Sequence, residues 1–214
     1  MLNRPRILIA EDHLMLAELC KRYLEAEFDV VGIVSNGQEL LSLACQMKPD
    51  VIVLDIAMPI LNGLDAGKRA KRVLPAVKLV YLTMNPDPQV AVEAFSRGAS
   101  GYLLKTGASN ELLIAVRSVL RGKPYLSSGL SKDQVDAIRW DRYRQTDFQE
   151  SLTDRQRDVR QLLAEGKQMK EVGDILNMST RTVAFHKYRI MSALGARSTA
   201  ELVRHAVRLR MVAA

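Results

Sequence analysis

Long apolar runs and cysteine frameworks are both missing from this 214-residue sequence. No stretch approaches the roughly 18 uninterrupted apolar residues that a membrane-spanning helix needs, and the run Ile7–Ala10 is too short for a signal peptide. The two cysteines, Cys20 and Cys45, make no disulfide framework, and no Cys/His cluster has zinc-ligand spacing. We therefore expect a cytoplasmic globular protein without a membrane partner, and we set aside secreted scaffolds and zinc fingers.

An excess of one charge is also missing from most of the chain. Residues 1–121 hold 14 Lys and Arg against 13 Asp and Glu, and residues 122–150 hold 5 of each kind. Residues 151–214 hold 12 basic against 6 acidic residues, so this segment carries +6 of the total +7. A small basic segment joined to a near-neutral one favours a polyanionic partner, most often nucleic acid, although a solvated basic surface gives the same count.

Short apolar segments alternate with segments of helical periodicity through the first 121 residues. The expected strands are Arg6–Ala10, Asp29–Val34, Val51–Leu54, Val77–Leu82 and Gly101–Leu104. The expected helices are His13–Ala26, Gln38–Met47, Leu64–Leu74, Pro88–Arg97 and Asn110–Arg121. Five β/α alternations predict an α/β fold, a doubly wound parallel sheet with helices on both faces.

The alternation stops at residue 122. Residues 123–149 contain loop-forming residues, a possible helix over Leu130–Tyr143 and a polar tail, so we expect a linker between domains at 1–122 and 150–214. The last domain is predicted to be all-α. The first of its four expected helices starts after Thr153 and ends at Ala164, and the second covers Lys170–Leu176. The third runs from Ser179 or Thr180 to Leu194, and the fourth runs from Ser198 or Thr199 to Arg210. The short second helix, tight turn and longer third helix indicate a helix-turn-helix.

Polar residues follow the predicted strands at their carboxyl ends, where open parallel sheets bind ligands. These residues are Glu11, Asp12, Asp55, Thr83 and Lys105. Three carboxylates at one edge repel each other and call for a cation, and all-oxygen ligation favours Mg²⁺. A lysine and a hydroxyl can hold a phosphoryl group, and an aspartate can accept one as an acyl phosphate. A single aspartate after a strand is more often a helix cap, so the hypothesis depends on the whole set.

Four segments of the first domain resemble the CheY-like receiver domain of response regulators. They are ILIAEDH (7–13), VIVLDIAMPILNG (51–63), VYLTM (80–84) and GASGYLLK (98–105). The resemblance implies the strand order 2-1-3-4-5 and a phosphoacceptor at Asp55. The Mg²⁺ ligands that it implies are Glu11, Asp12, Asp55 and the main-chain carbonyl of Ala57. It also implies that Lys105 pairs with the phosphate, that Thr83 is the switch hydroxyl and that Tyr102 turns inward on activation.

The third helix of the basic domain is expected to have two faces. At about 100° per residue, Val183, His186 and Ile190 fall on one side. The expected DNA contacts lie on or beside the opposite face: Thr180, Arg181, Thr182, Ala184, Phe185, Lys187, Tyr188 and Arg189, with Lys170 on the preceding helix. An outward Phe185 would alternatively pack on a neighbouring domain or helix.

Residues 151–210 resemble a LuxR-type DNA-binding domain, on segments such as LTDRQ (152–156), AEGKQMKEV (164–172) and STRTV (179–183). The sequence departs from the family at Gln156, where Glu is usual, and at Ala184, where a basic residue is common. A receiver followed by this domain is typical of the NarL/FixJ subfamily of response regulators.

The two resemblances together imply a two-component transcription regulator. A sensor histidine kinase would phosphorylate Asp55, and the chain would have no enzymatic role beyond self-phosphorylation and autodephosphorylation there. The unphosphorylated receiver is expected to cover or restrain the recognition helix. Phosphorylation would favour a homodimer that binds paired half-sites in promoter DNA, with RNA polymerase as a further partner. The candidate dimer surface consists of Leu202, Val203, Ala206 and Leu209 on the fourth helix.

Other classes of function remain open at this point. The helical domain of a partner-binding or phosphorelay switch would bind protein, against which the +6 charge and the helix-turn-helix spacing argue. A nucleotide- or flavin-binding enzyme would need a glycine-rich phosphate loop after the first strand, where the sequence has Glu11 and Asp12 instead. An acyl-homoserine-lactone regulator shares the C-terminal domain type, but its ligand domain does not resemble residues 1–121.

Overall fold

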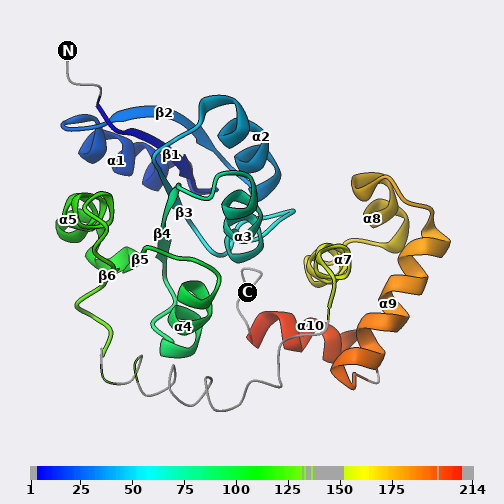
Figure 1. Ribbon diagram of the computed structural model, residues 1–214. Helices are drawn as coiled ribbons and strands as arrows, with labels where there is room; N and C mark the ends of the chain where they lie inside the picture. Colours follow the sequence, from blue (N-terminus) through cyan, green and yellow to red (C-terminus); the bar gives the residue numbers. More distant parts are fainter. Residues whose placement is uncertain (1–3, 132, 134–135, 137–151, 197, 209–214) are drawn as a thin grey trace.

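A six-stranded parallel sheet forms the centre of the N-terminal domain (Figure 1). The computed structural model describes residues 4–131, 133, 136, 152–196 and 198–208. The strands are β1 (Arg6–Ala10), β2 (Asp29–Val34), β3 (Val51–Leu54), β4 (Lys78–Thr83), β5 (Gly101–Leu104) and β6 (Tyr125–Leu126). They pair in the order 2-1-3-4-5-6, all in parallel. The doubly wound fold and the order of its first five strands are thereby confirmed.

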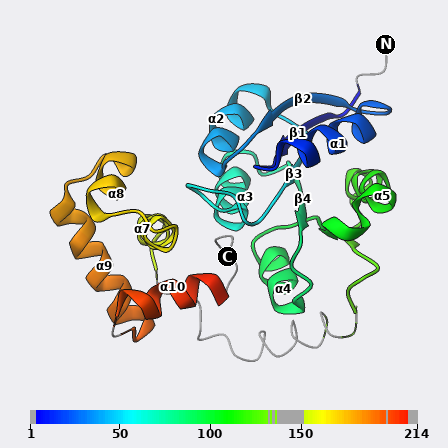
Figure 2. The same ribbon diagram turned by 180° about the vertical axis from the view of Figure 1, so that it is seen from behind.

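Helices cover both faces of this sheet, as Figures 1 and 2 show. The helices α1 (Leu14–Glu25) and α5 (Ala108–Leu120) pack on one face, where Leu24 and Val116 join an apolar cluster with β1 and β3. The helices α2 (Gly37–Met47), α3 (Gly63–Val73) and α4 (Pro88–Ser96) pack on the other face, where a second cluster includes Leu40 and Ala70. The alternating sides of β3 and β4 are buried in both clusters, which explains why these strands are almost wholly apolar.

The sixth strand corrects the expectation of a five-stranded sheet. Tyr125 donates its N–H to the carbonyl of Ser100 over 3.1 Å and extends the sheet beyond β5. The carboxylate of Glu111 on α5 then accepts hydrogen bonds from the Ser127 hydroxyl at 2.7 Å and the Ser128 N–H at 3.2 Å. A two-residue strand is too short to produce a period-2 pattern in the sequence. The predicted helix Leu130–Tyr143 lies mostly outside the described residues.

Four helices form the C-terminal domain around a separate apolar core. They are α7 (Asp154–Ala164), α8 (Met169–Leu176), α9 (Thr180–Leu194) and α10 (Thr199–Arg208). A capping box starts α7, because Thr153 and Gln156 satisfy each other's backbone N–H groups. The departure at Gln156 therefore keeps the cap. Within α8, a Cβ on Gly173 would lie 2.6 Å from the carbonyl oxygen of Met178 in the following turn, so only glycine fits there.

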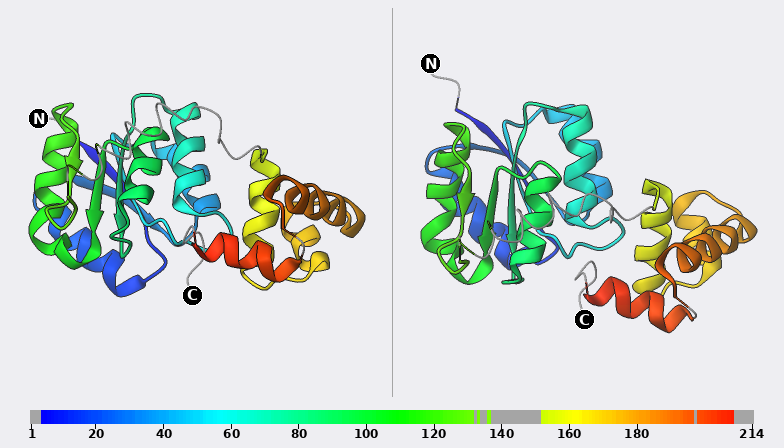
Figure 3. Two further views of the ribbon diagram at one scale, coloured as in Figure 1. Left: turned by 90° about the horizontal axis from the view of Figure 1, so that it is seen from below. Right: turned by 60° about the horizontal axis from the view of Figure 1, so that its bottom comes forward.

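The helical domain contacts the receiver through α7 and places α9 on its far side. The views in Figures 1 and 2 and both views in Figure 3 show α9 away from the sheet. Among the described residues, no helix is long and apolar enough to cross a membrane.

Candidate functional site

Four strand ends bring the predicted pocket residues to one edge of the sheet. Glu11 follows β1, Asp55 follows β3, Thr83 ends β4 and Lys105 follows β5. Glu11 and Asp55 are each only 3% exposed and Thr83 is 4% exposed. Parallel strands end on the same edge, so residues far apart in the sequence meet there.

Lys105 lies between the two buried carboxylates. Its Nζ is 2.9 Å from Asp55 Oδ2 and 2.8 Å from Glu11 Oε2. Burial alone would lower the pKa of Lys105, but the charges and hydrogen bonds of the two carboxylates outweigh it and raise the pKa. Burial also raises the pKa of Glu11, assisted by the charge of Asp55 and opposed by Lys105. The pocket therefore concentrates negative charge around one ammonium group.

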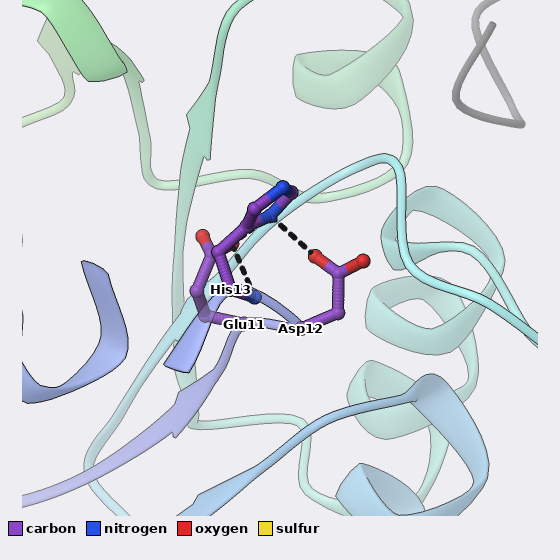
Figure 4. Close-up of side chains that lie close together, drawn as sticks. All are labelled: Glu11, Asp12 and His13. Carbon is purple, nitrogen blue, oxygen red and sulfur yellow. Dashed lines mark hydrogen bonds and ion pairs between the residues drawn. The ribbon is translucent and has the colours of Figure 1, made fainter. Parts of the chain in front are cut away.

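Asp12 and His13 extend the acidic group outward (Figure 4). Ligand atoms of Glu11, Asp12 and His13 lie within 4.8 Å of one another. His13 Nδ1 is 2.9 Å from Asp12 Oδ1 and 3.1 Å from Glu11 Oε1, and the charge of Asp12 is the main cause that raises the His13 pKa. Lys105 links Asp55 to this group, because its ammonium pairs with both Asp55 and Glu11. His13 was not among the site residues predicted from the sequence, although it directly follows the two acidic residues.

The donor set at this edge fits a hard divalent cation. Among the described groups, Glu11 Oε2 is buried and accepts no hydrogen bond, although the Lys105 ammonium lies 2.8 Å away as an ion-pair partner. The oxygens of Asp12 and Asp55 and the half-buried Ala57 lie on the adjoining loops. Oxygen ligands of this kind suit Mg²⁺.

Gly63 fixes the loop that carries Ala57. A Cβ on this residue would lie 1.9 Å from the carbonyl oxygen of Asp55, closer than real Cβ atoms approach. The Gly63 N–H donates to the Ile56 carbonyl at 2.9 Å, so α3 starts directly against the end of β3. Within the loop, Ile60 has a φ of 68°, which is a genuine outlier for a β-branched residue.

The two predicted switch residues meet at Asn85. The Thr83 hydroxyl accepts a hydrogen bond from the Asn85 N–H at 3.2 Å. Tyr102 is fully buried, and its hydroxyl donates to the Asn85 carbonyl at 2.9 Å. Tyr102 therefore already points inward in this structure, where the resemblance implied an inward turn only on activation. Asn85 was not singled out from the sequence.

The exposed face of α9 matches the face expected from its helical spacing. Val183 and Ile190 are fully buried, whereas Phe185 and Tyr188 are 60% and 73% exposed. The other expected contacts are also exposed, except for the half-buried Lys187: Thr180, Arg181, Thr182, Ala184, Arg189 and, on α8, Lys170.

The receiver docks on α7 and leaves this face open. Gln161 accepts hydrogen bonds from the Asn62 N–H and side-chain amide, both at 2.8 Å, and donates to the Met58 carbonyl at 2.9 Å. Glu165 accepts a hydrogen bond from the Ile60 N–H at 3.0 Å. The loop after Asp55 is therefore bonded directly to α7. Of the two expected alternatives, that the receiver covers the recognition helix is wrong for this structure, and that it restrains the helix stays a prediction.

Ion pairs extend the docking along α3. Asp65, which is 1% exposed, lies 2.9 Å from Arg157 of α7 and 2.7 Å from Arg97. Arg69 pairs with Asp158 at 2.5 Å. Burial raises the pKa of Asp158 against the opposing effect of Arg69. No sequence pattern indicates this interface, because polar residues on one face of a helix are equally typical of a solvated surface.

The predicted dimer surface on α10 is wrong in part. Leu202 and Ala206 are both fully buried, and Leu202 belongs to the core of the helical domain. Val203 is half-buried, and Leu209 lies outside the described residues. The fourth helix therefore uses its apolar stripe to complete its own domain.

Two family matches cover these two domains. Response regulator receiver domains match residues 7–117, and bacterial regulatory proteins of the luxR family match residues 150–206. The chain is 31% identical over 211 residues to the transcriptional regulatory protein MctR of Rhizobium johnstonii, covering 97% of this chain and 96% of that protein. The chain is a response regulator of the NarL/FixJ subfamily. This response regulator is also 31% identical to the oxygen regulatory protein NreC of Staphylococcus aureus over 214 residues, covering 97% and 99% of the two chains.

Solved structures agree with this assignment. A LuxR-family two-component response regulator from Aurantimonas is 27% identical, with a TM-score of 0.60, over 64% of this response regulator and 99% of that chain. RcsB of Salmonella typhimurium has a TM-score of 0.64 at 23% identity, over 97% and 99%, which shows the fold. RcsB has also been solved in complex with DNA. With its receiver and LuxR-type domains, this response regulator is a DNA-binding transcription regulator.

Proposed function

We propose that this response regulator accepts a phosphoryl group on Asp55 from a sensor histidine kinase, and that the transfer controls homodimer formation and promoter binding. The observation that carries this proposal is the buried Asp55 carboxylate, whose Oδ2 lies 2.9 Å from Lys105 Nζ. In the transfer, a carboxylate oxygen attacks phosphorus, an O–P bond forms and the N–P bond of the kinase phosphohistidine breaks. The electron pair of that bond stays on the imidazole nitrogen.

Lys105 and Thr83 would hold the transferred group. A phosphoryl group brings close to two negative charges and three acceptor oxygens, which attract an ammonium and a hydroxyl at the same edge. Mg²⁺, when bound, would neutralise charge on the transferring oxygens. The residues that we assign to it are Glu11, Asp12, Asp55 and the Ala57 main-chain carbonyl.

The hydrogen bonds of Asn85 support a route out of the pocket. If the Thr83 hydroxyl turns toward the phosphoryl oxygens, the Asn85 N–H loses its acceptor at 3.2 Å. The Tyr102 hydroxyl donates to the carbonyl of the same residue, so a shift of Asn85 changes the hydrogen bond of this aromatic side chain. Because Tyr102 is already buried, we expect activation to move the loop after β4 more than the ring itself.

A second route leads to the helical domain. The loop that follows Asp55 is bonded to α7 through Gln161 and Glu165, so a phosphoryl group that moves this loop alters the docking of the two domains. Such a change is a shift between docked and released populations, biased by the phosphate contacts. Release would free the helical domain to form a dimer on paired half-sites and to approach RNA polymerase.

Phosphorylation by a small donor tests the site. We would incubate the protein with acetyl phosphate and Mg²⁺ and measure by intact mass how many phosphoryl groups are added to the chain. We expect one phosphoryl group per chain, none in Asp55→Asn, and normal labelling in Asp29→Asn, whose exposed side chain lies at the start of β2. Labelling of Asp55→Asn would overturn the assignment of Asp55, and labelling unaffected by EDTA would overturn the role of Mg²⁺.

Capture of genomic DNA tests the consequence. The protein is mixed with sheared DNA of its source organism, with and without acetyl phosphate, and the retained fragments are sequenced. Discrete sites that are enriched by the donor support gated promoter binding. Equal enrichment without the donor would contradict the gate while leaving DNA binding intact.

A further inference from the structure

Two large apolar side chains stand exposed on α9. Phe185 is 60% exposed and Tyr188 is 73% exposed, while the apolar residues of the opposite side, such as Val183 and Ile190, are fully buried. Ala184, which directly precedes Phe185, is exposed as well. In the described part of the chain, the hydrogen bonds and ion pairs between domains all involve α7 or its cap Glu165, so the receiver does not account for this apolar surface.

Positive charge surrounds these side chains. Arg181 and Arg189 are exposed one turn before and one turn after Phe185, and Lys170 is exposed on the neighbouring α8. Residues 179–194 contain no aspartate or glutamate. An apolar centre with cationic flanks is complementary to a major groove, where phosphates line both sides and base edges form the floor.

The apolar group on a major-groove floor is the 5-methyl group of thymine. We propose that Phe185, together with Ala184 and Tyr188, contacts thymine methyl groups, so that thymines specify the half-site of this regulator. This inference rests on the proposed promoter binding and names the chemistry that the α9 surface recognises. Ala184 suits the role, because its short side chain lets a thymine methyl approach the helix beside the larger Phe185 ring.

The position and orientation of Phe185 support direct contact. It lies in the second turn of α9, near the end from which recognition helices present side chains to bases. Its ring packs edge-to-face on His186, with centroids 5.8 Å apart and planes at 67°. That contact restricts the ring before DNA arrives, which lowers the entropy lost on binding.

Replacing thymine by deoxyuridine tests the inference, because it removes the methyl group and leaves base pairing and charge unchanged. Preferred duplexes are selected from random DNA with the full chain, with and without acetyl phosphate. Affinity is then measured on duplexes in which single thymines are replaced. We expect about a fourfold loss for each contacted methyl group, the factor for burying one methyl. We also expect Phe185→Ala to bind thymine and uracil equally at one such position.

Matched variants separate apolar contact from other causes. Tyr188→Phe keeps the ring and should keep the discrimination, whereas Tyr188→Ala should lose it at a second position. Arg189→Ala should weaken binding to both duplexes alike and reduce the salt dependence. The three substituted side chains, Phe185, Tyr188 and Arg189, are exposed, so the circular dichroism spectrum of each variant should match the parent.

The outcomes distinguish the inference from the function on which it rests. If selected duplexes bind equally well with uracil throughout, the thymine-methyl inference is wrong and DNA binding stands. If Phe185→Ala loses affinity for both duplexes by the same factor, the ring contacts sugar or phosphate and the inference is again wrong. If selection enriches no sequence in either condition, both promoter binding and the inference are overturned, and a protein partner for α9 takes their place.

Discussion

Replacing Gln161 by alanine should separate the two domains without unfolding either one. The Gln161 side chain is 1% exposed and forms three hydrogen bonds with the receiver, to Met58 and to both nitrogens of Asn62. The receiver and the helical domain have separate apolar cores, so neither depends on this side chain for its own packing. The cost of the substitution therefore falls on docking.

The size of the effect follows from the groups that lose their partners. A buried polar group left without a partner costs about 1–3 kcal/mol. Water can hydrogen-bond these groups once the domains separate, so the substitution destabilises only the docked state. We expect the docked state to lose about 2–4 kcal/mol relative to the open state. Because 1.4 kcal/mol is tenfold, the equilibrium constant for opening should rise about 30- to 700-fold.

Hydrogen exchange at Ile60 measures this opening. Its N–H donates to Glu165 Oε1, which the substitution leaves in place but deprives of a 2.9 Å hydrogen bond from Gln161 Nε2, so faster exchange reports loosening of the whole docked contact. Gln156→Ala is the matched control, because Gln156 lies on the same helix and bonds within its own domain. An Ile60 exchange rate that is unchanged in Gln161→Ala, or raised equally in the control, would refute the reasoning.

Three further predictions follow from other contacts. Gly63→Ala should destabilise the fold by about 2–3 kcal/mol or more in urea unfolding, because its Cβ would meet the end of β3 at 1.9 Å, whereas Gly101→Ala, with neighbours at 3.4 Å and beyond, should change little. Burial raises the pKa of Glu111, but hydrogen bonds from two serines lower it to a net value below its usual 4.5. The unfolded chain then binds more protons than the folded one. The difference in unfolding free energy between the parent and Glu111→Ala should therefore have its full value above about pH 4.5 and shrink below it, and a difference that widens in acid would contradict this. Burial also raises the pKa of Cys20 to about 11, while Cys45 is exposed, so a thiol reagent near pH ~8 should titrate one thiol per native chain and two in denaturant.

The sheet and the position of the pocket follow from the pattern of residues along the chain. Each β/α alternation demands a parallel strand, parallel strands end on one edge, and Asp55 and Lys105 must then meet although 50 positions separate them. The two faces of α9 follow in the same way from the helical repeat, which hides Val183 and exposes Phe185. These features depend on local periodicity, which a single sequence displays.

The contacts between helices and between domains depend on how the chain packs in three dimensions. The apolar stripe of α10 would equally well serve a dimer or its own core, and packing against α7 buries Leu202 inside the domain. The inward Tyr102 depends on a loop carbonyl 17 positions away. Gln161 and Asp65 carry no apolar signal, and only the surface that approaches them distinguishes a buried, paired polar group from a solvated one. A pairing of polar surfaces leaves no period in the sequence, because its partners belong to different domains.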